Sequence, residues 1–467
     1  MTAPALAPPR KTRRGSELFL LIFAVLLAGM VSVAIEGALG EGMTPAPLWF
    51  AATLGVMFGI THIAIRLFAP YADPVLFPLV ALLNGLGVAL IHRLDLADAA
   101  PNERFKVHFL TGNASLQLAW TAVGLALLIA VLVIVRDHRV LARYSYTLGL
   151  IGLALLAIPA LLPASLSQVN GARIWIRVAG FSIQPGEFAK IALIVFFASY
   201  LVAKRDVLSL ASRRIAGIDF PRGRDLGPVL VAWIASLLVL IFEKDLGSSL
   251  LFFGIFIVML YIATQRTSWL LIGLMLFAGG AFMAWTLFAH VQDRVAIWLH
   301  PFKDADDKGF QIVQALYGLA TGRLFGTGPG AGRPEIVPYA NSDFIVATIG
   351  EELGLFGLTA VLVIYALIVA RGLRTALTVR DSFGKLLAAG LAFSVGLQVF
   401  VVVGGVTKLI PLTGLTTPFL SYGGSSLVAN YVLIGLLLRI SDAARRPPTS
   451  QQAVQPLQNA PTELVRL

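Results

Sequence analysis

Residues 226–264 read LGPVLVAWIASLLVLIFEKDLGSSLLFFGIFIVMLYIAT, with two apolar runs at 226–242 and 248–264. Only Glu243–Gly247 separates the two runs. About 20 mostly apolar residues are enough for a helix to cross the hydrocarbon core of a bilayer. The short polar interruption therefore predicts a tight turn between two membrane helices. Because the runs are continuous and do not alternate with polar residues, they favour helices over a membrane barrel.

The same pattern recurs along the whole chain and predicts an all-α integral membrane protein, a bundle of about twelve transmembrane helices. Of the 467 residues, 57% are hydrophobic and 13% are charged, against roughly 25% charged residues in soluble domains. This composition excludes a soluble globular enzyme, a disordered chain and a fibrous protein. The absence of cysteine excludes a disulfide scaffold, a thiolate metal site and a cysteine nucleophile. The predicted spans lie near 17–38, 48–68, 75–92, 115–136, 145–166, 186–203, 226–242, 248–264, 268–290, 344–370, 385–408 and 419–439.

Basic residues mark one side of the predicted bundle. With the N-terminus placed in the cytoplasm, every cytoplasmic segment is basic, as the positive-inside rule requires. The largest clusters lie at 10–14, 136–143, 204–224, 371–385 and 439–446. The net charge of +11 is therefore explained by topology and by attraction to anionic membrane lipid, without nucleic acid. We predict a multi-pass plasma-membrane protein with both termini cytoplasmic.

The segments outside the spans differ in character. Residues 1–16 are predicted to form a basic cytoplasmic N-terminus. The apolar run that follows has no small-residue cleavage site, so it is predicted to be a retained membrane anchor and not a cleaved signal peptide. Residues 441–467 form a cytoplasmic tail, predicted to be disordered from Pro447 onward. The loop 291–343 is far longer than most connections and is predicted to fold on the extracytoplasmic surface, with a short amphipathic helix at 309–319.

The run Pro418–Ser426 reads PFLSYGGSS, at the mouth of a span. Its glycines and serines interrupt the helix and expose backbone N–H groups, which suits an anionic headgroup or a pyrophosphate. The alternative is a close contact between helices through small residues. The candidate ligands in this run are Ser421, Gly423, Gly424 and Ser425.

This run resembles a signature of the SEDS (RodA/FtsW/SpoVE) family of peptidoglycan polymerases. Blocks at Gly171–Ile176, Gln184–Lys190, Asp245–Ser249 and Asp343–Gly354 resemble further family motifs, in the right order. The resemblance covers residues 75–440 and implies a ten-helix core. The two helices within 17–74 then look like an N-terminal addition, similar to that of actinobacterial RodA-type members. The chain departs from the family pattern where Gly186 replaces serine, Glu243-Lys244 replaces Gln-Pro, and Asn341-Ser342 replaces His-Thr.

The resemblance implies a peptidoglycan glycosyltransferase that polymerises lipid II on the outer face of the membrane, in cell elongation. The chemistry would be an inverting displacement of undecaprenyl pyrophosphate from a growing glycan. It needs a base for the acceptor hydroxyl and positive charge for the leaving pyrophosphate. The implied partner is a class B penicillin-binding protein. The alternatives are a division-type FtsW polymerase, a lipid II flippase and a non-catalytic scaffold, of which the flippase has no need of a base in the outer loop.

The acidic turn of the outer loop holds the candidate base. From the residues alone, Asp304, Asp306 and Asp307 are equivalent, and any of them could simply cap the next helix. In the family, an essential aspartate precedes the glutamine of a Gly-Tyr-Gln motif by seven residues. Counting back from Gln311 selects Asp304 as the catalytic residue. Because Ala305 stands where the family has proline, a register slip stays open.

The predicted substrate-binding residues are spread over the resembling blocks. Glu187 and Lys190 share one helix face and could form either a substrate site or a self-satisfied ion pair. Arg173 and Lys408 are outside cations that suit a pyrophosphate, unless they only snorkel to the interface. Glu351 and Glu352 cannot share a helix face, so at least one is structural. The full set comprises Arg173, Glu187, Lys190, Asp245, Gln311, Asp343, Glu351, Lys408, Ser421, Gly423, Gly424 and Ser425.

No organic cofactor is expected, and none of the six histidines forms a ligand pair at helical spacing. A divalent cation, Mg²⁺ or Mn²⁺, that bridges the pyrophosphate to outer carboxylates would be compatible with this chemistry.

Overall fold

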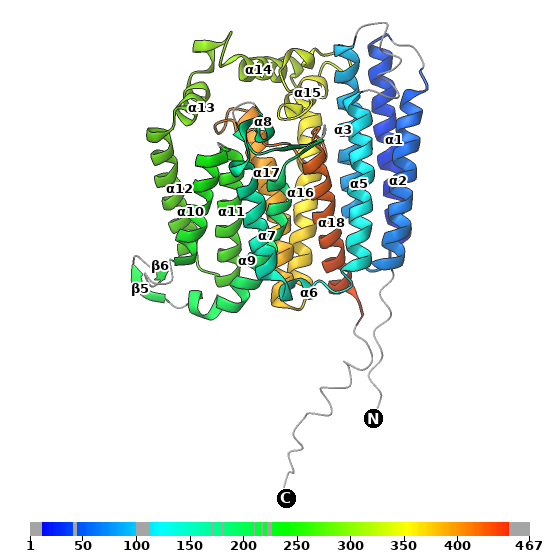
Figure 1. Ribbon diagram of the computed structural model, residues 1–467. Coiled ribbons are helices and arrows are strands. Elements are labelled where there is room, and N and C mark those ends of the chain that lie inside the picture. The colour runs from blue at the N-terminus through cyan, green and yellow to red at the C-terminus, as the bar shows by residue number, and fades with distance from the viewer. Residues whose placement is uncertain are drawn as a thin grey trace, which may run out of the picture.

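The computed structural model describes residues 12–40, 44–99, 112–169, 172–178, 181–209, 211–215, 218–221, 227–243 and 245–447. The predicted basic segment before residue 12 and the tail after residue 447 lie outside the described residues. Within them the chain forms a bundle of roughly parallel and antiparallel helices (Figure 1). The all-α membrane fold predicted from the apolar runs is confirmed.

Ten described helices are long and apolar enough to cross a membrane. They are α1 (Arg14–Ala38), α2 (Ala46–Phe68), α3 (Leu76–Asp98), α5 (Asn113–Ile134), α9 (Pro185–Ser209), α11 (Leu246–Thr264), α12 (Ser268–Leu287), α16 (Gly354–Thr378), α17 (Ser382–Val406) and α18 (Gly424–Arg445). Two shorter apolar helices, α7 (Ser145–Leu161) and α10 (Gly227–Glu243), complete the predicted set.

The predicted span 344–370 is wrong at its start. The structure has a short helix α15 (Ile345–Glu352) there, and α16 begins only at Gly354. Gly354 has φ +68°, and a Cβ atom at this position would collide with the backbone of Gly326. Only glycine fits such a turn. The predicted span 419–439 also begins later, at Gly424, because the residues before it form a loop.

Short elements gather at one end of the bundle (Figure 1). These are α13 (Ala289–Leu299), the 3₁₀ turn η3 (Pro301–Asp304), α14 (Phe310–Gly322), the 3₁₀ turn η4 (Pro334–Ile336) and α15. Helix α14 confirms the amphipathic helix predicted at 309–319, since Ile312, Val313 and Ala315 are buried. We call this end the loop end.

Two hairpins lie between α7 and α9, after the one-turn helix α8 (Ala164–Ser167), and the sequence did not predict them. They pair β1 (Gln168–Val169) with β2 (Ala172–Arg173), and β3 (Ile176–Val178) with β4 (Phe181–Ile183), both antiparallel. Two further short elements lie at the end of the bundle opposite the loop end (Figure 1). They are a third hairpin, β5 (Ala211–Ile215) with β6 (Ile218–Pro221), and the one-turn helix α6 (Val140–Arg143).

Helix α3 lies inside the bundle. In its most apolar stretch 89% of the residues are buried, against 28% in α1. Helices α1, α5 and α16 pack around it. The α1–α2 pair thus covers a face of α3 that would otherwise meet lipid.

The start of α1 and the end of α18 lie at the same end of the bundle, opposite the loop end (Figure 1). Arg445 pairs with Asp73, and the Tyr71 N–H donates to Asp442 over 2.9 Å. This end carries most of the described Lys and Arg residues of the predicted cytoplasmic segments, and we call it the basic end.

Candidate active site

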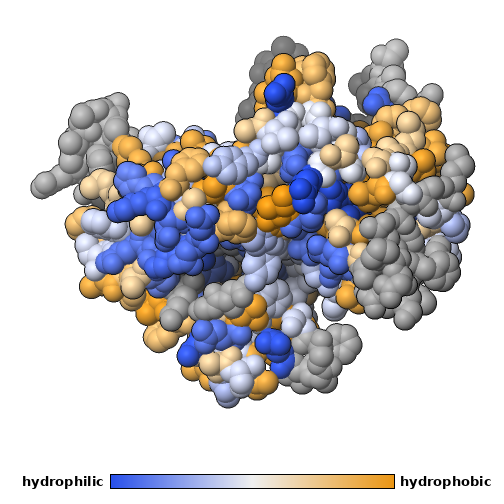
Figure 2. Space-filling view, turned by 90° about the horizontal axis from the view of Figure 1, so that it is seen from above, coloured by the Kyte–Doolittle hydropathy of each residue, from blue (hydrophilic) through white to orange (hydrophobic). Residues whose placement is uncertain are grey.

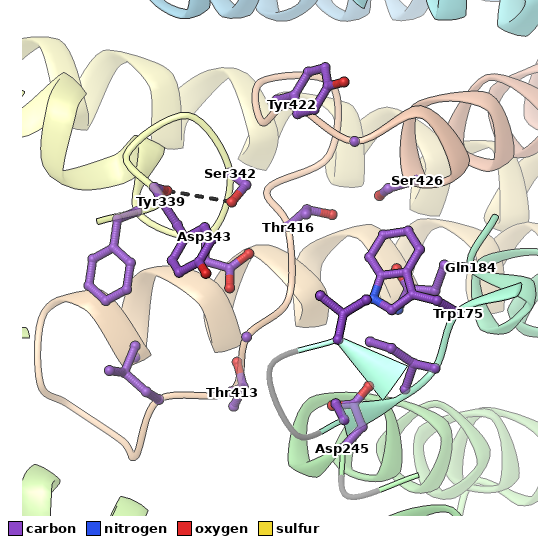
Figure 3. A pocket seen from close by; sticks show the side chains of 18 of the residues that line it. Trp175, Gln184, Asp245, Tyr339, Ser342, Asp343, Thr413, Thr416, Tyr422 and Ser426 are labelled. Atoms are coloured by element: carbon purple, nitrogen blue, oxygen red, sulfur yellow. Dashed lines mark hydrogen bonds between the residues drawn. The ribbon is translucent and has the colours of Figure 1, made fainter. Parts of the chain in front are cut away.

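A cavity of about 990 Å³ opens at the loop end. Hydrophilic side chains gather on this end of the molecule around a central hollow (Figure 2). Figure 3 shows the side chains that reach the cavity from separate parts of the chain: the β-hairpins, the start of α11, the loop before α15, and the segment between α17 and α18. The cavity therefore exists only in the folded bundle.

One wall of the cavity is apolar. Helix α5 contributes Leu116, Ala119 and Val123, and the hairpin region contributes Val169 and Ile174. Leu116 and Val123 are 50% and 44% exposed, so this wall is open and apolar.

Another part of the lining carries two acids and a cation. Asp245, Arg294 and Asp343 all line the cavity. A Cβ atom at Gly414 would lie 3.8 Å from an Asp343 oxygen and 4.0 Å from an Arg294 nitrogen. Asp245 also caps α11, since its carboxylate accepts from Gly247 N–H over 2.9 Å and from the Ser248 hydroxyl over 2.6 Å.

A backbone carbonyl between α17 and α18 holds the Arg294 side chain in place. Its Nη1 donates to the Leu412 carbonyl over 2.6 Å. The same guanidinium acts electrostatically on Asp245 and Asp343. A guanidinium that lines the cavity is a suitable group to bind an anionic ligand there.

Asp343 titrates near neutrality. Burial raises its pKa to about 7, opposed by Arg294 and reinforced by Asp245. The folded chain therefore holds this proton more tightly than the unfolded chain. The contribution of protonated Asp343 to the free energy of unfolding is fully present below pH 3.8, the ordinary pKa of an aspartate. It is lost as the pH rises through about 7, the raised pKa of Asp343 in the folded chain.

We expect this titration to affect the binding of an anionic ligand in the cavity. As the pH rises from 6 to 8, Asp343 becomes negative beside Asp245 and Arg294, so the affinity for a diphosphate should fall. Asp343→Asn should abolish that part of the pH dependence. The measurement is the apparent affinity for a polyprenyl diphosphate against pH for both proteins. An unchanged pH profile in Asp343→Asn would contradict this assignment.

Two lysines add positive charge to the lining, Lys308 and Lys408. Lys408 has φ +62°, and its carbonyl accepts from Trp298 Nε1 over 3.1 Å. Lys308 donates to the exposed Asp293 over 2.9 Å. Hydrogen bonding and charge from Asp293, with smaller effects of Asp304 and Asp307, raise the pKa of Lys308.

Asp304 is exposed, at the end of η3, and lies beside the lining of the cavity without being part of it. Its carbonyl accepts from Gly309 N–H over 2.8 Å, which closes the turn. A Cβ atom at Gly309 would lie 2.7 Å from that carbonyl oxygen, so only glycine fits. The turn places Asp304 near Lys308, which does line the cavity.

The PFLSYGGSS run supplies another part of the lining, through Gly423, Gly424 and Ser425. These residues begin α18, whose N-terminus carries a partial positive charge. A Cβ atom at Gly424 would lie 2.5 Å from the Trp120 indole. The structure therefore combines both interpretations of this run, a small-residue contact and a polar edge of the cavity.

Gln311 also lines the cavity, and its amide donates to the Pro338 carbonyl over 3.1 Å. Of the predicted substrate residues, the cavity thus brings together Asp245, Gln311, Asp343, Lys408, Gly423, Gly424 and Ser425.

Glu187 and Lys190 are not among the residues that line the cavity, and their contact with substrate stays a prediction. Lys190 Nζ is 2.8 Å from Glu187 and 2.8 Å from the Gln398 side-chain oxygen. Both charged side chains are buried. Gln398 in turn donates to the Thr416 carbonyl, so the pair supports the loop that lines the cavity. The ion pair that the sequence left open is thus present in the structure.

Three further predicted ligands have other positions. Ser421 is buried, and its hydroxyl donates to the Ser342 carbonyl over 2.6 Å. Glu351 is buried and accepts from Arg333 N–H over 2.7 Å. Arg173 lies in β2, where its neighbours Ala172 and Ile174 reach the cavity. Ser421 and Glu351 bond to other parts of the protein and do not line the cavity, Arg173 borders it, and a substrate contact of these residues stays a prediction.

The sequence analysis missed Arg294 and Lys308. Both lie in charged stretches of the long loop, where a cation next to an acid usually indicates a solvated surface. The only available signal was their position on the side where basic residues are depleted.

The described residues contain no group of three or more histidines and acids that could hold a metal ion. The two acids that line the cavity, Asp245 and Asp343, have Arg294 beside them. These residues do not fit a metal site built by the protein alone.

The family model of FtsW/RodA/SpoVE cell cycle proteins matches residues 74–446. The chain belongs to this family. The prediction drawn from the five sequence blocks is thereby confirmed, and the match begins just after α2.

Among curated relatives of the family, peptidoglycan glycosyltransferase RodA of Mycobacterium tuberculosis is 53% identical over 99% of this chain and 97% of its own length. The RodA of Mycobacterium leprae is 51% identical over 98% of this chain and 97% of its length. These relatives confirm the predicted RodA type and the prediction of a glycosyltransferase.

Solved structures of the family share the fold. A peptidoglycan synthase complex that coordinates polymerisation and crosslinking contains a chain with TM-score 0.60 and 27% identity, over 79% of this chain and 97% of that one. The rod shape-determining protein RodA of Thermus thermophilus matches with TM-score 0.54 and 24% identity, over 81% of this chain and 98% of that one.

Proposed function

We propose that this chain polymerises lipid II into glycan strands at the loop end of the bundle, as a RodA-type elongation enzyme. The observation that carries the proposal is the cavity, which joins an exposed apolar wall to charged residues near Asp304. A polyprenyl-diphosphate sugar has the same division into a lipid tail, an anionic centre and a polar saccharide.

The reaction can be written with this chain's residues. The 4-hydroxyl oxygen of the acceptor sugar forms a bond to the anomeric carbon of the donor glycan. The bond from that carbon to the diphosphate oxygen breaks, and polyprenyl diphosphate leaves with the electron pair. Asp304 takes the hydroxyl proton as general base. Because attack and departure occur on opposite faces, the anomeric centre inverts.

The departing diphosphate needs positive charge that is already in place. Arg294, Lys308 and Lys408 supply three cations along the lining, and the N-terminus of α18 adds a partial charge. Asp304 lies outside the lining, next to Lys308. This separation suits a base that meets the saccharide while the diphosphate stays in the cavity.

The first test is direct. The purified full chain is incubated with fluorescent lipid II in detergent, and the products are separated by size. We expect a ladder of glycan polymer that a muramidase degrades. Absence of polymer, with the crosslinking partner present or absent, would refute the proposed function.

The proposal requires the loop end to face outward. The basic residues at the opposite end support this orientation, as the positive-inside rule states. The chain has no cysteine, so single cysteines report cleanly. Arg333→Cys, at a side chain 77% exposed in the loop end, should react with an impermeant thiol reagent on intact cells. Arg374→Cys at the basic end should react only after lysis. The reverse pattern would contradict the orientation and the catalytic assignment.

We further propose a class B penicillin-binding protein as the partner. The similar synthase complex that joins polymerisation to crosslinking supports this pairing. The test is co-purification of the full chain with a class B penicillin-binding protein from the same organism. We expect the two to co-purify and the complex to polymerise lipid II faster than the chain alone.

A further inference from the structure

The α1–α2 hairpin lies outside the stretch that the family model matches, which begins at residue 74. The Mycobacterium tuberculosis relative covers 99% of this chain and so includes a counterpart of the hairpin. The contacts of the hairpin within this chain indicate what it does.

Helix α1 packs unusually closely on α3. A Cβ atom at Gly85 of α3 would lie only 2.8 Å from Ala28 Cβ of α1. Since this separation is shorter than a normal van der Waals contact, glycine at 85 is what lets the helices approach. Near the loop end, Glu36 of α1 lies 3.4 Å from His92 of α3, and the Phe50 ring of α2 is 4.8 Å from the same His92 ring.

The outer end of α1 contacts the glycine-rich part of the long loop. Gly330 has φ +82°, and a Cβ atom there would lie 2.7 Å from the Ile35 carbonyl oxygen and 2.9 Å from Ile35 Cα. Backbone thus meets backbone. No side chain could be inserted at this contact without moving α1 or the loop.

Helix α3 holds the same loop from another side. The Arg93 guanidinium donates to Glu352 over 2.6 Å, to Glu335 over 2.7 Å and to the Gly332 carbonyl over 2.6 Å. Glu352 also accepts from Gly330 N–H over 3.1 Å. Glu352 and Arg93 are both buried. The loop around 330–335 is therefore fixed between α1, α3 and α15.

This fixed segment leads directly into the cavity wall. Tyr339, Ser342 and Asp343 follow η4 and line the cavity (Figure 3). The Pro338 carbonyl, directly before Tyr339, accepts from Gln311 of α14. A shift at Gly330 would thus be transmitted to the acid wall and to the helix that follows the Asp304 turn.

We propose that the α1–α2 hairpin is a brace that positions the outer loop for the glycosyl transfer, with Ala28, Ile35 and Gly330 as positioning residues. None of them lines the cavity. The proposal rests on the proposed function for its activity readout, but the packing that it asserts can be measured independently.

The first test wedges the hairpin away from α3 in the full-length protein. Ala28→Leu inserts a large side chain opposite Gly85, while Ala34→Leu makes the same change at an exposed position of the same helix. A displacement of about 1 Å at an active site can cost up to about 10²-fold in rate, so we expect roughly a tenfold lower kcat for Ala28→Leu. The KM for lipid II should stay within about twofold, and Ala28→Ser should keep the activity.

Amide hydrogen exchange is the independent readout. The N–H groups of Gly326, Thr327, Gly328 and Gly330 are hydrogen-bonded. Their exchange should accelerate at least tenfold in Ala28→Leu, while amides of α17 and α18 keep their wild-type rates. Ala34→Leu should match the wild type in both measurements.

If Ala28→Leu does not insert, a glycine pair tests the same contact. Gly330→Ala and Gly328→Ala both place alanine at positive φ, +82° and +104°. A Cβ atom at Gly328 meets nothing closer than 3.9 Å, whereas that at Gly330 meets α1. We expect Gly330→Ala alone to reduce kcat and loop protection beyond the effect of Gly328→Ala.

Equal kcat and equal exchange for the members of each pair would overturn the brace. Absence of polymer from the wild type would refute the proposed function, and the exchange comparison would then decide the brace by itself.

Discussion

Asp304→Asn should lower polymerisation of lipid II by about 10²–10⁴-fold, the contribution of a well-placed general base. A side-chain amide has the size of the carboxylate but cannot take the proton of the acceptor hydroxyl. Asp304→Asn should therefore fail almost as severely as Asp304→Ala, and Asp304→Glu should keep a trace of activity. The measurement is glycan formed from labelled lipid II at equal protein.

The neighbouring acids are the controls for this prediction. Asp306 and Asp307 are exposed in the same turn, and their amide variants should stay within several-fold of the wild type. Since Asp304 is exposed and its turn is closed by backbone hydrogen bonds, Asp304→Asn should insert normally. Normal activity of Asp304→Asn together with a dead Asp306→Asn or Asp307→Asn would show that the register is wrong.

Arg294→Gln should lower kcat by about 10²–10³-fold, the cost of removing one preorganised charge stabiliser from a transition state. The variant leaves Asp245 and Asp343 without their shared cation, so the cavity becomes more negative where the diphosphate must gain charge. Arg294→Lys keeps the charge and should recover part of the rate. The measurement is kcat and KM for lipid II in each variant.

Arg333→Gln is the matched control, because this cation belongs to the same long loop but its side chain is 77% exposed and outside the lining of the cavity. It should stay within twofold of the wild type. If Arg333→Gln and Arg294→Gln lose activity equally, the effect comes from the net charge of the loop end, and the assignment of Arg294 fails.

The spans were predictable because the bilayer thickness imposes one length on every apolar run. The boundaries at 344 and 419 were not, since both depend on loops. Residues 345–352 are apolar enough to extend the next span, and only the packing of Gly354 against Gly326 shows that the helix is broken.

The candidate site was predictable where a motif itself forms the cavity wall, as at Asp245, Asp343 and Gly423–Ser425. It was not predictable where a partner is distant in sequence. The sequence pairs Lys190 with Glu187 on one helix face, but it does not reveal the second partner, Gln398, which is 208 residues away. Arg294 reads as a surface charge until the fold brings Asp245 and Asp343 beside it.

The family resemblance supplied the register of Asp304, which no local feature of the acidic turn distinguishes. The structure adds a physical context for that choice, since the turn holds Asp304 beside a cavity-lining lysine. It also shows that the α1–α2 addition is packed into the loop end.

The measurement that tests the central claim most directly uses vesicles that contain the purified full chain and labelled lipid II. Polymer and the transbilayer distribution of unreacted lipid II are read from the same sample, for the wild type and Asp304→Asn. Our account predicts muramidase-sensitive polymer with the wild type, little or none with Asp304→Asn, and no protein-dependent movement of lipid II in either. Movement of lipid II between leaflets in both proteins, without polymer, would contradict the account and establish a flippase.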